Sequence, residues 1–290
     1  MIKLPQVTIY NSTSVKGKGL FTGEESTVEF HPAPINFGIV IEKINNNKIV
    51  DSFKLNYDKI KSTPYHCSAV GNDNFTIYTV EHLLAALYCL EISNIIIKVH
   101  GNEIPILDGS AEKFLLALKT CGIHKQNEHS RETVYVSRNI NITSPHGYIK
   151  CYPSKHLVVN MTIENEKIFK TGSKTINFDE TEDSFYVMFS RAKTFSTQDK
   201  LEYMKQNGIF PKGGTTQNAI IYNNGEIINL ESASYPNDEA LRHKILDFCG
   251  DMLLSGVHIK GRFECLNSGH SMNHDFLKEV FSKKENYQVV

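Results

Sequence analysis

The chain has 290 residues, of which 40% are hydrophobic and 22% are charged, and its formal net charge is −1. This length suggests two domains with room for buried cores, and the composition excludes wholesale disorder. The balance of charge gives no electrostatic reason to expect nucleic acid or an anionic membrane as the main partner, although a local basic patch could still bind a phosphorylated small molecule.

The cysteines and the hydropathy exclude several further classes of protein. Six cysteines are spread over the chain, and no two are close enough in sequence to form a C-x-x-C pair. This spacing argues against a redox dithiol and against a four-cysteine zinc site. The opening residues lack a charged segment followed by an apolar core, and no run approaches the roughly 18 apolar residues of a membrane-spanning helix. We therefore expect a soluble, cytoplasmic protein with no secretory signal and no transmembrane segment.

The first third of the chain has the pattern of strands separated by turns. Residues 5–11 alternate loosely, and residues 26–30 form a short β-type run. The period changes at Thr79, which is a candidate helix cap. Residues 80–90 are an unbroken run rich in alanine and leucine, which predicts a helix.

A strand and a second helix are predicted next. Residues 95–99 favour a strand because three consecutive isoleucines are followed, one residue later, by a valine. Residues 110–121 have the amphipathic pattern of a helix, and Gly122 is a typical stop signal.

The domain boundary is predicted in the polar stretch 125–131, which contains almost no apolar side chain. We place an N-terminal α+β domain over 1–126 and a C-terminal α+β domain over 131–290. The second domain has predicted strands near 133–142, 147–152 and 157–164, and predicted helices over 184–192, 238–254 and 271–282. Strands followed by helices, twice over, favour two α+β domains rather than one doubly wound sheet.

Three acidic or imidazole side chains recur at a spacing of four in the longest predicted helix. His243, Asp247 and Asp251 therefore lie on one helical face, about one turn apart. A histidine and a carboxylate at this spacing can bind one metal ion together. The alternative is a solvated polar face, and the spacing alone does not exclude it.

A second candidate pair opens the helix predicted at 80–90. His82 could supply a third metal ligand, which is the number that hydrolytic zinc sites take from the protein. Glu81 is rotated by about 100° from His82 and could accept a proton from water without ligating the metal. The alternative is an ordinary helix N-terminus, where glutamate is favoured by the helix dipole.

Two further side chains complete an inventory of hydrolytic groups. His270 lies in a glycine-flanked loop, where we expect it to be exposed and able to act as a general acid. Lys244 follows His243 and could meet an anionic substrate or a developing oxyanion. Together these residues supply what a zinc amidohydrolase needs.

Longer segments carry a family resemblance. They are Thr79-Val-Glu-His-Leu-Leu-Ala-Ala-Leu87, Asn102-Glu-Ile-Pro-Ile-Leu-Asp-Gly-Ser110, Arg242-His-Lys-Ile-Leu-Asp247, Gly250-Asp251 and Ser268-Gly-His270 with Asn273. Weaker matches are Gly17-Lys-Gly-Leu20, Pro32-Ala-Pro34 and the stretch from Arg191 to Phe195. In this order and over nearly the full length, the chain resembles the UDP-3-O-acyl-N-acetylglucosamine deacetylases of lipid A biosynthesis.

The resemblance implies a fold and an activity. The fold is two similar α+β domains with the active site between them, and an inserted unit near 196–222 lines an apolar passage for the acyl chain. The activity is zinc-dependent removal of the N-acetyl group from UDP-3-O-acyl-N-acetylglucosamine, which releases acetate and is the committed step of lipid A biosynthesis. The expected metal is Zn²⁺, with Fe²⁺ as the alternative, and the expected state is a monomer.

The resemblance also implies a role for each matching residue. His82, His243 and Asp247 correspond to the metal ligands, and Glu81 to the general base. His270 corresponds to the general acid, and Asp251 to the carboxylate that orients it. Thr194 corresponds to the oxyanion contact, Phe195 to the sugar contact and Lys244 to the diphosphate contact.

Three departures from the family pattern concern substrate fit. Phe21 stands where the family motif near the N-terminus has histidine, and Asn267 stands where a lysine often precedes Ser-Gly-His. Phe210-Pro-Lys replaces a leucine-rich approach to Gly213-Gly214, which leaves the acyl-chain preference open. The first two changes leave open a zinc amidohydrolase acting on a different N-acetylated sugar. A binding protein that keeps the fold without catalysis is the rival from another class, and the loss of a ligand or of Glu81 would favour it.

Overall fold

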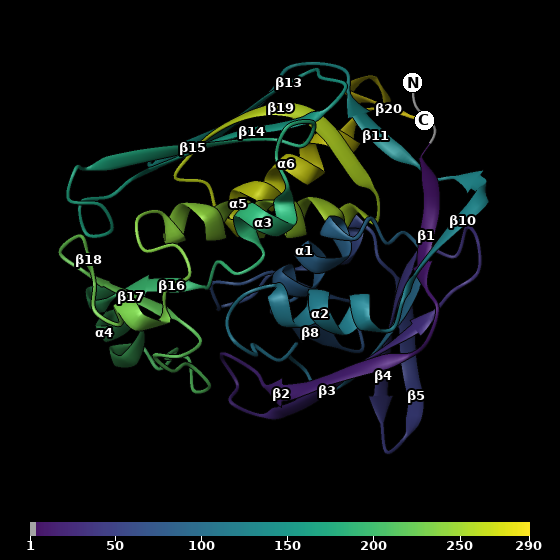
Figure 1. The fold of residues 1–290 in the computed structure, drawn as a ribbon, viewed down its shortest axis with the longest axis horizontal. Helices are drawn as coiled ribbons and strands as arrows, with labels where there is room; N and C mark the ends of the chain where they lie inside the picture. The colour runs from purple at the N-terminus through teal and green to yellow at the C-terminus, as the bar shows by residue number, and fades with distance from the viewer. Residues whose placement is uncertain (1–3) are drawn as a thin grey trace.

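The computed structural model describes residues 4–290, and its two main β-sheets lie on opposite sides of a central layer of helices (Figure 1). The elements of the N-terminal half are β1 (Pro5–Ile9), β2 (Thr13–Lys18), β3 (Glu25–Pro32), β4 (Ile39–Asn45), β5 (Lys48–Lys54), β6 (Ile60–Lys61), β7 (Ala69–Gly71), β8 (Thr76–Tyr78), α1 (Glu81–Cys89), β9 (Ile95–His100), α2 (Glu112–Thr120) and β10 (Ile123–Ser130).

The C-terminal half follows without a break. Its elements are β11 (Thr133–Val136), β12 (Ile140–Ser144), β13 (Gly147–Tyr152), β14 (Leu157–Glu164), β15 (Ser173–Asp179), α3 (Phe185–Phe189), β16 (Phe195–Thr197), α4 (Gln198–Gln206), β17 (Ile220–Asn223), β18 (Glu226–Ile227), α5 (Glu239–Met252), β19 (His258–Leu266), α6 (His270–Ser282) and β20 (Tyr287–Val289). Short 3₁₀ turns lie at 57–59, 230–232, 253–255 and 284–286.

The two main sheets share one topology. Strand order β2-β3-β9-β4-β5 in the N-terminal half matches β12-β13-β19-β14-β15 in the C-terminal half. In both sheets the central strand, β9 or β19, pairs antiparallel with one hairpin and parallel with the other. One helix precedes and one follows each central strand, namely α1 and α2 around β9, and α5 and α6 around β19. The fold is therefore α+β with two similar halves, as the sequence predicts.

The helices of the two halves meet at the centre of the molecule. Helix α1 packs against α5, between the two sheets (Figure 1). In the C-terminal half, Phe248 of α5, Phe263 of β19 and Phe276 of α6 are fully buried and meet edge to face at 4.9 and 5.1 Å. Burying these large apolar side chains fixes each helix on its sheet.

The start of α1 differs from the prediction that Thr79 caps it. Val80 is the N-cap residue and makes no capping side-chain hydrogen bond. Thr79 has a left-handed backbone with φ of 59°, and its hydroxyl donates to Glu103 instead. A cap needs extended backbone geometry, which this conformation does not provide.

The predicted linker 125–131 also differs, because β10 occupies most of it and pairs with β1. The amide of Gln126 is buried, donates to the carbonyl of Ala33 and accepts from Asn94. Polar side chains can thus belong to a paired strand when hydrogen bonds satisfy them. The boundary between domains in this stretch stays a prediction. The predicted strand over 133–142 is two strands, β11 and β12, which belong to different parts of the sheet.

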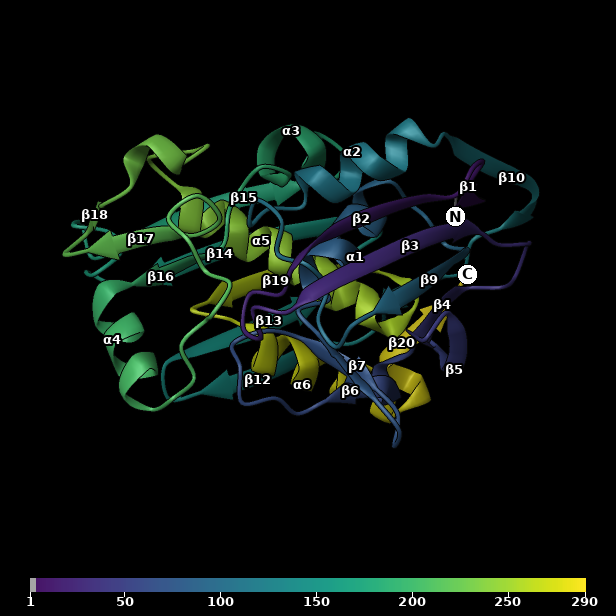
Figure 2. The ribbon, with the colours of Figure 1, turned by 90° about the horizontal axis from the view of Figure 1, so that it is seen from below.

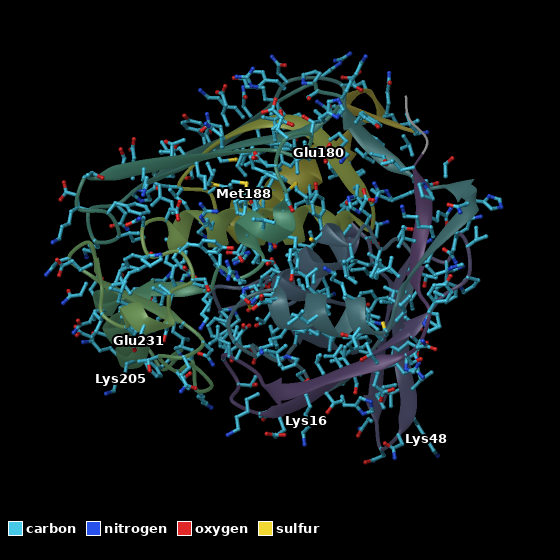
Figure 3. The ribbon with its side chains drawn as sticks, in the orientation of Figure 1. Lys16, Lys48, Glu180, Met188, Lys205 and Glu231 are labelled. Carbon is cyan, nitrogen blue, oxygen red and sulfur yellow. The ribbon has the colours of Figure 1, made fainter. Side chains whose placement is uncertain are left out.

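A smaller unit projects from one end of the molecule. Strands β16, β17 and β18 form a three-stranded sheet, and α4 lies beside β16 and β17 (Figures 1 and 2). Lys205 of α4 lies at this end, and Lys48 lies at the tip of the projecting β4–β5 hairpin (Figure 3). No helix within residues 4–290 is long and apolar enough to cross a membrane.

Candidate active site

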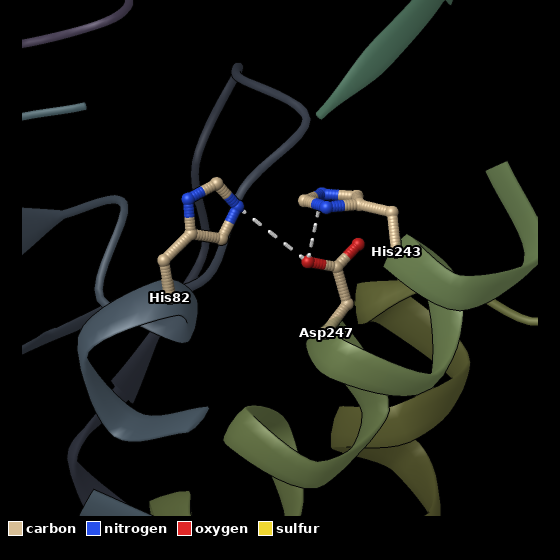
Figure 4. Close-up of side chains that lie close together, drawn as sticks. All are labelled: His82, His243 and Asp247. Carbon is tan, nitrogen blue, oxygen red and sulfur yellow. Dashed lines mark ion pairs between the residues drawn. The ribbon is translucent and has the colours of Figure 1, made fainter. Parts of the chain in front are cut away.

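Two histidines and a carboxylate converge from α1 and α5 (Figure 4). His82 lies in the first turn of α1, and His243 and Asp247 lie one turn apart on α5. Oδ1 of Asp247 is 3.2 Å from Nε2 of His243 and 3.7 Å from Nε2 of His82. A tetrahedral ion with ligands at about 2.0–2.1 Å separates those ligands by roughly 3.3 Å. The three side chains therefore fit an ion of this size.

The polar atoms of the three residues also suit a bound cation. Oδ1 of Asp247 is buried and has no hydrogen-bond partner among the described residues, and Nε2 of both histidines faces it. Nδ1 of His243 lies 3.0 Å from the carbonyl oxygen of Ala192, so we assign the ring proton to Nδ1, where it can be donated to this oxygen. Nε2, which faces Asp247, then carries a free lone pair that can bind a metal ion. A buried carboxylate oxygen without a partner is costly, and a divalent metal ion is a partner that compensates it.

The charge states of two of these residues match those of metal ligands. Burial, reinforced by His243, lowers the pKa of His82 to about 3, so its imidazole is neutral. Burial by itself would raise the pKa of Asp247, but His243, His270 and Lys244 together outweigh burial and hold this pKa below its ordinary value. A neutral imidazole and an ionised carboxylate are the forms that bind metal ions.

Gly250 explains why the two helices can bring these residues together. A Cβ atom at this position would lie 2.1 Å from the carbonyl oxygen of Glu81 and 3.1 Å from the backbone nitrogen of Ala85. Any side chain here would force α1 away from α5. The glycine in the Gly250-Asp251 motif is therefore needed for the close approach of the helices that carry His82 and Asp247.

The structure excludes the two alternatives that the spacing left open. His243, Asp247 and Asp251 are 2%, 4% and 0% exposed, so their helical face is buried and not solvated. Glu81 and His82 are each 3% exposed, which is not an ordinary solvated helix N-terminus.

Glu81 and His270 flank the triad and face each other. Oε1 of Glu81 is 3.8 Å from Nε2 of His270, and this nitrogen is 3.9 Å from Oδ2 of Asp247. Burial raises the pKa of Glu81 to about 8. A metal cation beside the carboxylate would lower that pKa again. The two side chains can thus exchange protons with a molecule placed between them.

Asp251 holds the imidazole of His270 in position. Oδ2 of Asp251 lies 2.8 Å from Nδ1 of His270 and accepts a second hydrogen bond from Nδ2 of Asn273 at 2.7 Å. Burial by itself lowers the pKa of His270, but the carboxylates of Asp251, Asp247 and Glu81 together outweigh burial and raise it to about 9. His270 was expected in an exposed loop. It is instead the first residue of α6, with a side chain only 15% exposed, because Asp251 draws it inward.

Two residues of this network were not predicted from the sequence. The hydroxyl of Ser68 donates to Oδ1 of Asp251, and Nε2 of His274 lies 2.8 Å from the same hydroxyl. The backbone N–H of Ser68 donates to Oε2 of Glu81 at 3.0 Å. His274 was given no role, although its position one turn after His270 on α6 was a usable signal. Ser68 directly precedes the short strand β7, and no regular spacing in the sequence relates it to Glu81 or Asp251.

A cleft of about 1310 Å³ opens in front of the triad, and Thr194, Phe195 and Lys244 line it as expected. Nζ of Lys244 lies 3.9 Å from Oδ2 of Asp247 and 5.9 Å from the centre of the Phe195 ring. The cationic side chains that line the cleft are Lys61, Lys200, Lys244 and Lys278. Four carboxylates also line the cleft, namely Glu81, Glu164, Asp247 and Asp275, so the lysines offer local contacts for an anionic group and not a uniformly positive surface.

An apolar pocket of about 290 Å³ adjoins the cleft, and Phe195 and Lys200 line both cavities. Phe21 lines this pocket, and its ring stacks on that of Tyr65 with the ring centres 4.6 Å apart. The phenylalanine that replaces the family's histidine therefore makes the pocket lining more apolar. Apolar residues of α4 and the loop after it also line the pocket, namely Leu201, Met204, Phe210 and Pro211.

Asn267, the second departure, has a local structural role. Its backbone is left-handed with φ of 46°, a conformation that asparagine adopts more readily than lysine. Its side chain accepts from the backbone N–H of Glu164 and donates to the carbonyl of His146. Asn267 lines the cleft without a positive charge of its own.

Comparison with known proteins identifies the family to which this sequence is similar. The family model described as LpxC, UDP-3-O-acyl N-acetylglycosamine deacetylase, matches residues 6–282. Proteins named UDP-3-O-acyl-N-acetylglucosamine deacetylase are similar along the whole chain. The one from Wigglesworthia glossinidia brevipalpis is 33% identical over 99% of this chain and 95% of its own length. The one from Oleidesulfovibrio alaskensis is 34% identical over 97% of this chain and 90% of its own length.

Proposed function

The chain belongs to the UDP-3-O-acyl N-acetylglycosamine deacetylase family, and from this premise we propose that it hydrolyses the N-acetyl group of UDP-3-O-acyl-N-acetylglucosamine in lipid A biosynthesis. The observation that carries the proposal is the buried triad of His82, His243 and Asp247 with Glu81 and His270 beside it. A deacetylase needs this combination of a metal site, a base and an acid in one cleft.

We propose that His82, His243 and Asp247 hold a zinc ion, with Fe²⁺ as the alternative. The bound ion supplies Lewis-acid chemistry, which acidifies water and polarises a carbonyl group. Two imidazole nitrogens and one carboxylate oxygen are ligands that zinc commonly takes.

Glu81 is the proposed general base. Its carboxylate accepts a proton from the water that attacks the acetamide carbonyl, while the backbone N–H of Ser68 fixes its other oxygen. Because Glu81 is buried, its charged form is destabilised and proton uptake is favoured. The hydroxyl of Thr194 is proposed to donate to the oxygen that becomes negative in the attack.

His270 is the proposed general acid. An amine leaves an amide readily only when it is protonated, so an acid must face the nitrogen that departs. Asp251 stabilises the imidazolium form of His270 at 2.8 Å and keeps the Nε2 proton directed toward the cleft. The products are acetate and the free amine of the UDP-linked sugar, which balances the addition of one water.

The cleft suggests how the substrate is held. We propose that Lys244 contacts the diphosphate, that Phe195 contacts the sugar, and that the apolar pocket beside Phe195 receives the 3-O-acyl chain. A polar cleft that carries lysines, next to a separate apolar pocket, matches a substrate with one charged end and one acyl chain. We also propose that the enzyme acts as a monomer in the cytoplasm.

The test is acetate release from UDP-3-O-acyl-N-acetylglucosamine, with metal content measured on the same protein. The proposal expects turnover that requires about one metal ion per chain, that stops with a chelator, and that is lost in His82→Ala. Bound metal without turnover would instead indicate a different N-acetylated substrate. Protein with neither metal nor turnover would contradict the proposal and favour a binding protein.

A further inference from the structure

Glu103 is a buried carboxylate that the proposed mechanism does not use. It lies between β9 and α2 and is 1% exposed. Its Oε1 accepts from the backbone N–H of Phe21 at 2.9 Å and from the hydroxyl of Thr79 at 2.8 Å. Its Oε2 accepts from the backbone N–H and the hydroxyl of Thr22, both at 2.8 Å. Four donors from two distant segments therefore converge on one side chain.

The first segment leads directly into α1. Thr79 has φ of 59°, and a left-handed backbone is an outlier for a β-branched residue. Such a conformation persists when surrounding contacts hold it, and the Thr79 hydroxyl bond to Glu103 is one such contact. Glu81 and His82 follow within three residues. The position of Thr79 thus sets where the first turn of α1 begins.

The second segment is the turn that forms a wall of the apolar pocket. Leu20 and Phe21 line the pocket, and Phe21 is stacked on Tyr65. A Cβ atom at Gly19 would lie 2.3 Å from Oε2 of Glu103, so the turn packs directly against the carboxylate. The position of Glu103 thus sets where this wall lies.

We propose that Glu103 is a positioning residue that places the wall of the apolar pocket relative to the catalytic turn of α1, and that it thereby sets the discrimination between substrates by acyl-chain length. One carboxylate bonded to both segments fixes the distance between the acyl chain and the reacting acetamide. The inference rests on the proposed deacetylase function, because the pocket is taken as the acyl site.

The test compares two substrates in Glu103→Gln. A glutamine amide keeps the size of the side chain, but its NH₂ group must face either the Phe21 and Thr79 donors or the Thr22 donors, so two acceptor positions are lost. We expect the ratio of kcat/KM for a long-chain 3-O-acyl substrate to that for one with half the chain length to fall about tenfold. A variant that is only less stable contains less active protein, which lowers both values equally and leaves the ratio unchanged.

Glu180→Gln is the matched control. Glu180 accepts from the backbone N–H of Leu157 and pairs with Lys260, and it lies beside the C-terminal sheet, away from β2 and β3 (Figure 3). The same change there should leave the ratio as in the wild type. An unchanged ratio in Glu103→Gln would overturn the proposal. If Glu103→Gln does not fold, Thr79→Val provides a second test, because it removes the hydroxyl that donates to Glu103 and should also lower the ratio. Thr79→Ser keeps this hydroxyl and should give the wild-type ratio.

A measurement without substrate separates this proposal from the proposed function. If the wild type shows no turnover, the deacetylase function fails, and Co²⁺ affinity measured by absorbance then decides the positioning role. Weaker Co²⁺ binding in Glu103→Gln and Thr79→Val, with normal binding in Glu180→Gln and Thr79→Ser, would show that Glu103 positions His82. Equal binding in all variants would overturn that role.

Discussion

The hydroxyl of Ser68 donates a hydrogen bond to Oδ1 of Asp251, although the two residues are 183 positions apart in the sequence. The same residue donates its backbone N–H to Glu81. Ser68 therefore contacts the proposed base directly, and it contacts the proposed acid both through Asp251 and at 3.3 Å between its hydroxyl and Nδ1 of His270. A single residue of the N-terminal half thus fixes the relative position of two groups that must act on one substrate.

Ser68→Ala is expected to lower kcat without removing the metal. The change deletes one donor to Asp251 and leaves those from His270 and Asn273 in place. Loss of a residue that orients a functional side chain typically lowers activity about 10- to 100-fold, and we expect the lower end of that range. Steady-state acetate release and metal content on the same sample measure both effects.

Ser255→Ala is the control for a buried serine outside the site. Ser255 is buried, and its hydroxyl donates to the carbonyl of Met252 at 2.8 Å. Its loss should change stability but not kcat per folded enzyme. Equal kcat in Ser68→Ala and Ser255→Ala would show that the Ser68 hydroxyl has no part in positioning.

The spacing of residues on α5 could be read from the sequence, whereas the burial of that face could not. His243, Asp247 and Asp251 share one face of any helix, but a solvated face has the same spacing. Burial depends on α1 packing across that face, and this contact is between segments far apart in the chain. His82 could be named as a candidate ligand from the sequence, but no local pattern links it to α5, and only the family resemblance assigned it to the same site.

The residues missed by the sequence analysis depend on tertiary contacts of loops. Ser68 and Glu103 lie outside helices, and their partners are in segments that no periodicity connects to them. Thr79 was predicted as a cap from its residue type alone. Its left-handed backbone arises because Glu103 takes its hydroxyl, which only the folded chain reveals.

Gly250→Ala tests whether the close approach of α1 and α5 is needed for the metal site. The added Cβ would lie 2.1 Å from the carbonyl oxygen of Glu81, so the helices must separate. Overpacking of this kind destabilises proteins by about 1–3 kcal/mol, and we expect Co²⁺ affinity to fall at least tenfold as well. Urea unfolding and Co²⁺ titration measure the two effects.

Gly208→Ala provides the comparison for Gly250→Ala. Gly208 has φ of 72° and no atom within 4 Å of an added Cβ, so alanine there strains the backbone without touching a neighbour. It should lose about 1 kcal/mol of stability and keep its metal affinity. Normal Co²⁺ binding by Gly250→Ala would mean that His82 and Asp247 do not need the helices in close contact.

Substitution should separate ligands from acid–base residues. Asp247→Ala is expected to lose both metal and turnover. Glu81→Ala and His270→Ala are expected to keep about one metal ion per chain while turnover falls roughly 10²- to 10⁴-fold, the usual range for acid–base residues. Metal analysis after dialysis and acetate release distinguish the two classes. Near-normal turnover of either acid–base variant would remove the role assigned to that residue.

His258 is expected to make the folded protein less stable in mild acid. It is 3% exposed, lies 3.2 Å from Nη1 of Arg131 and stacks on Tyr88, away from the metal site. Burial, reinforced by Arg131, lowers its pKa well below 6.5. In the unfolded chain the same imidazole takes up a proton near pH 6.5, so the unfolded state binds more protons as the pH falls below that value.

The stability that neutral His258 contributes is therefore complete above pH about 6.5 and is lost progressively as the pH falls toward its folded pKa. Between pH about 7.5 and 5.5 this single group should remove about 1 kcal/mol from the free energy of unfolding. Urea unfolding of His258→Gln should show a correspondingly smaller loss over that interval, because glutamine takes up no proton. His129→Gln, at an exposed position, is the matched control. The same pH dependence in wild type and His258→Gln would mean that protonation of His258 does not weaken the fold.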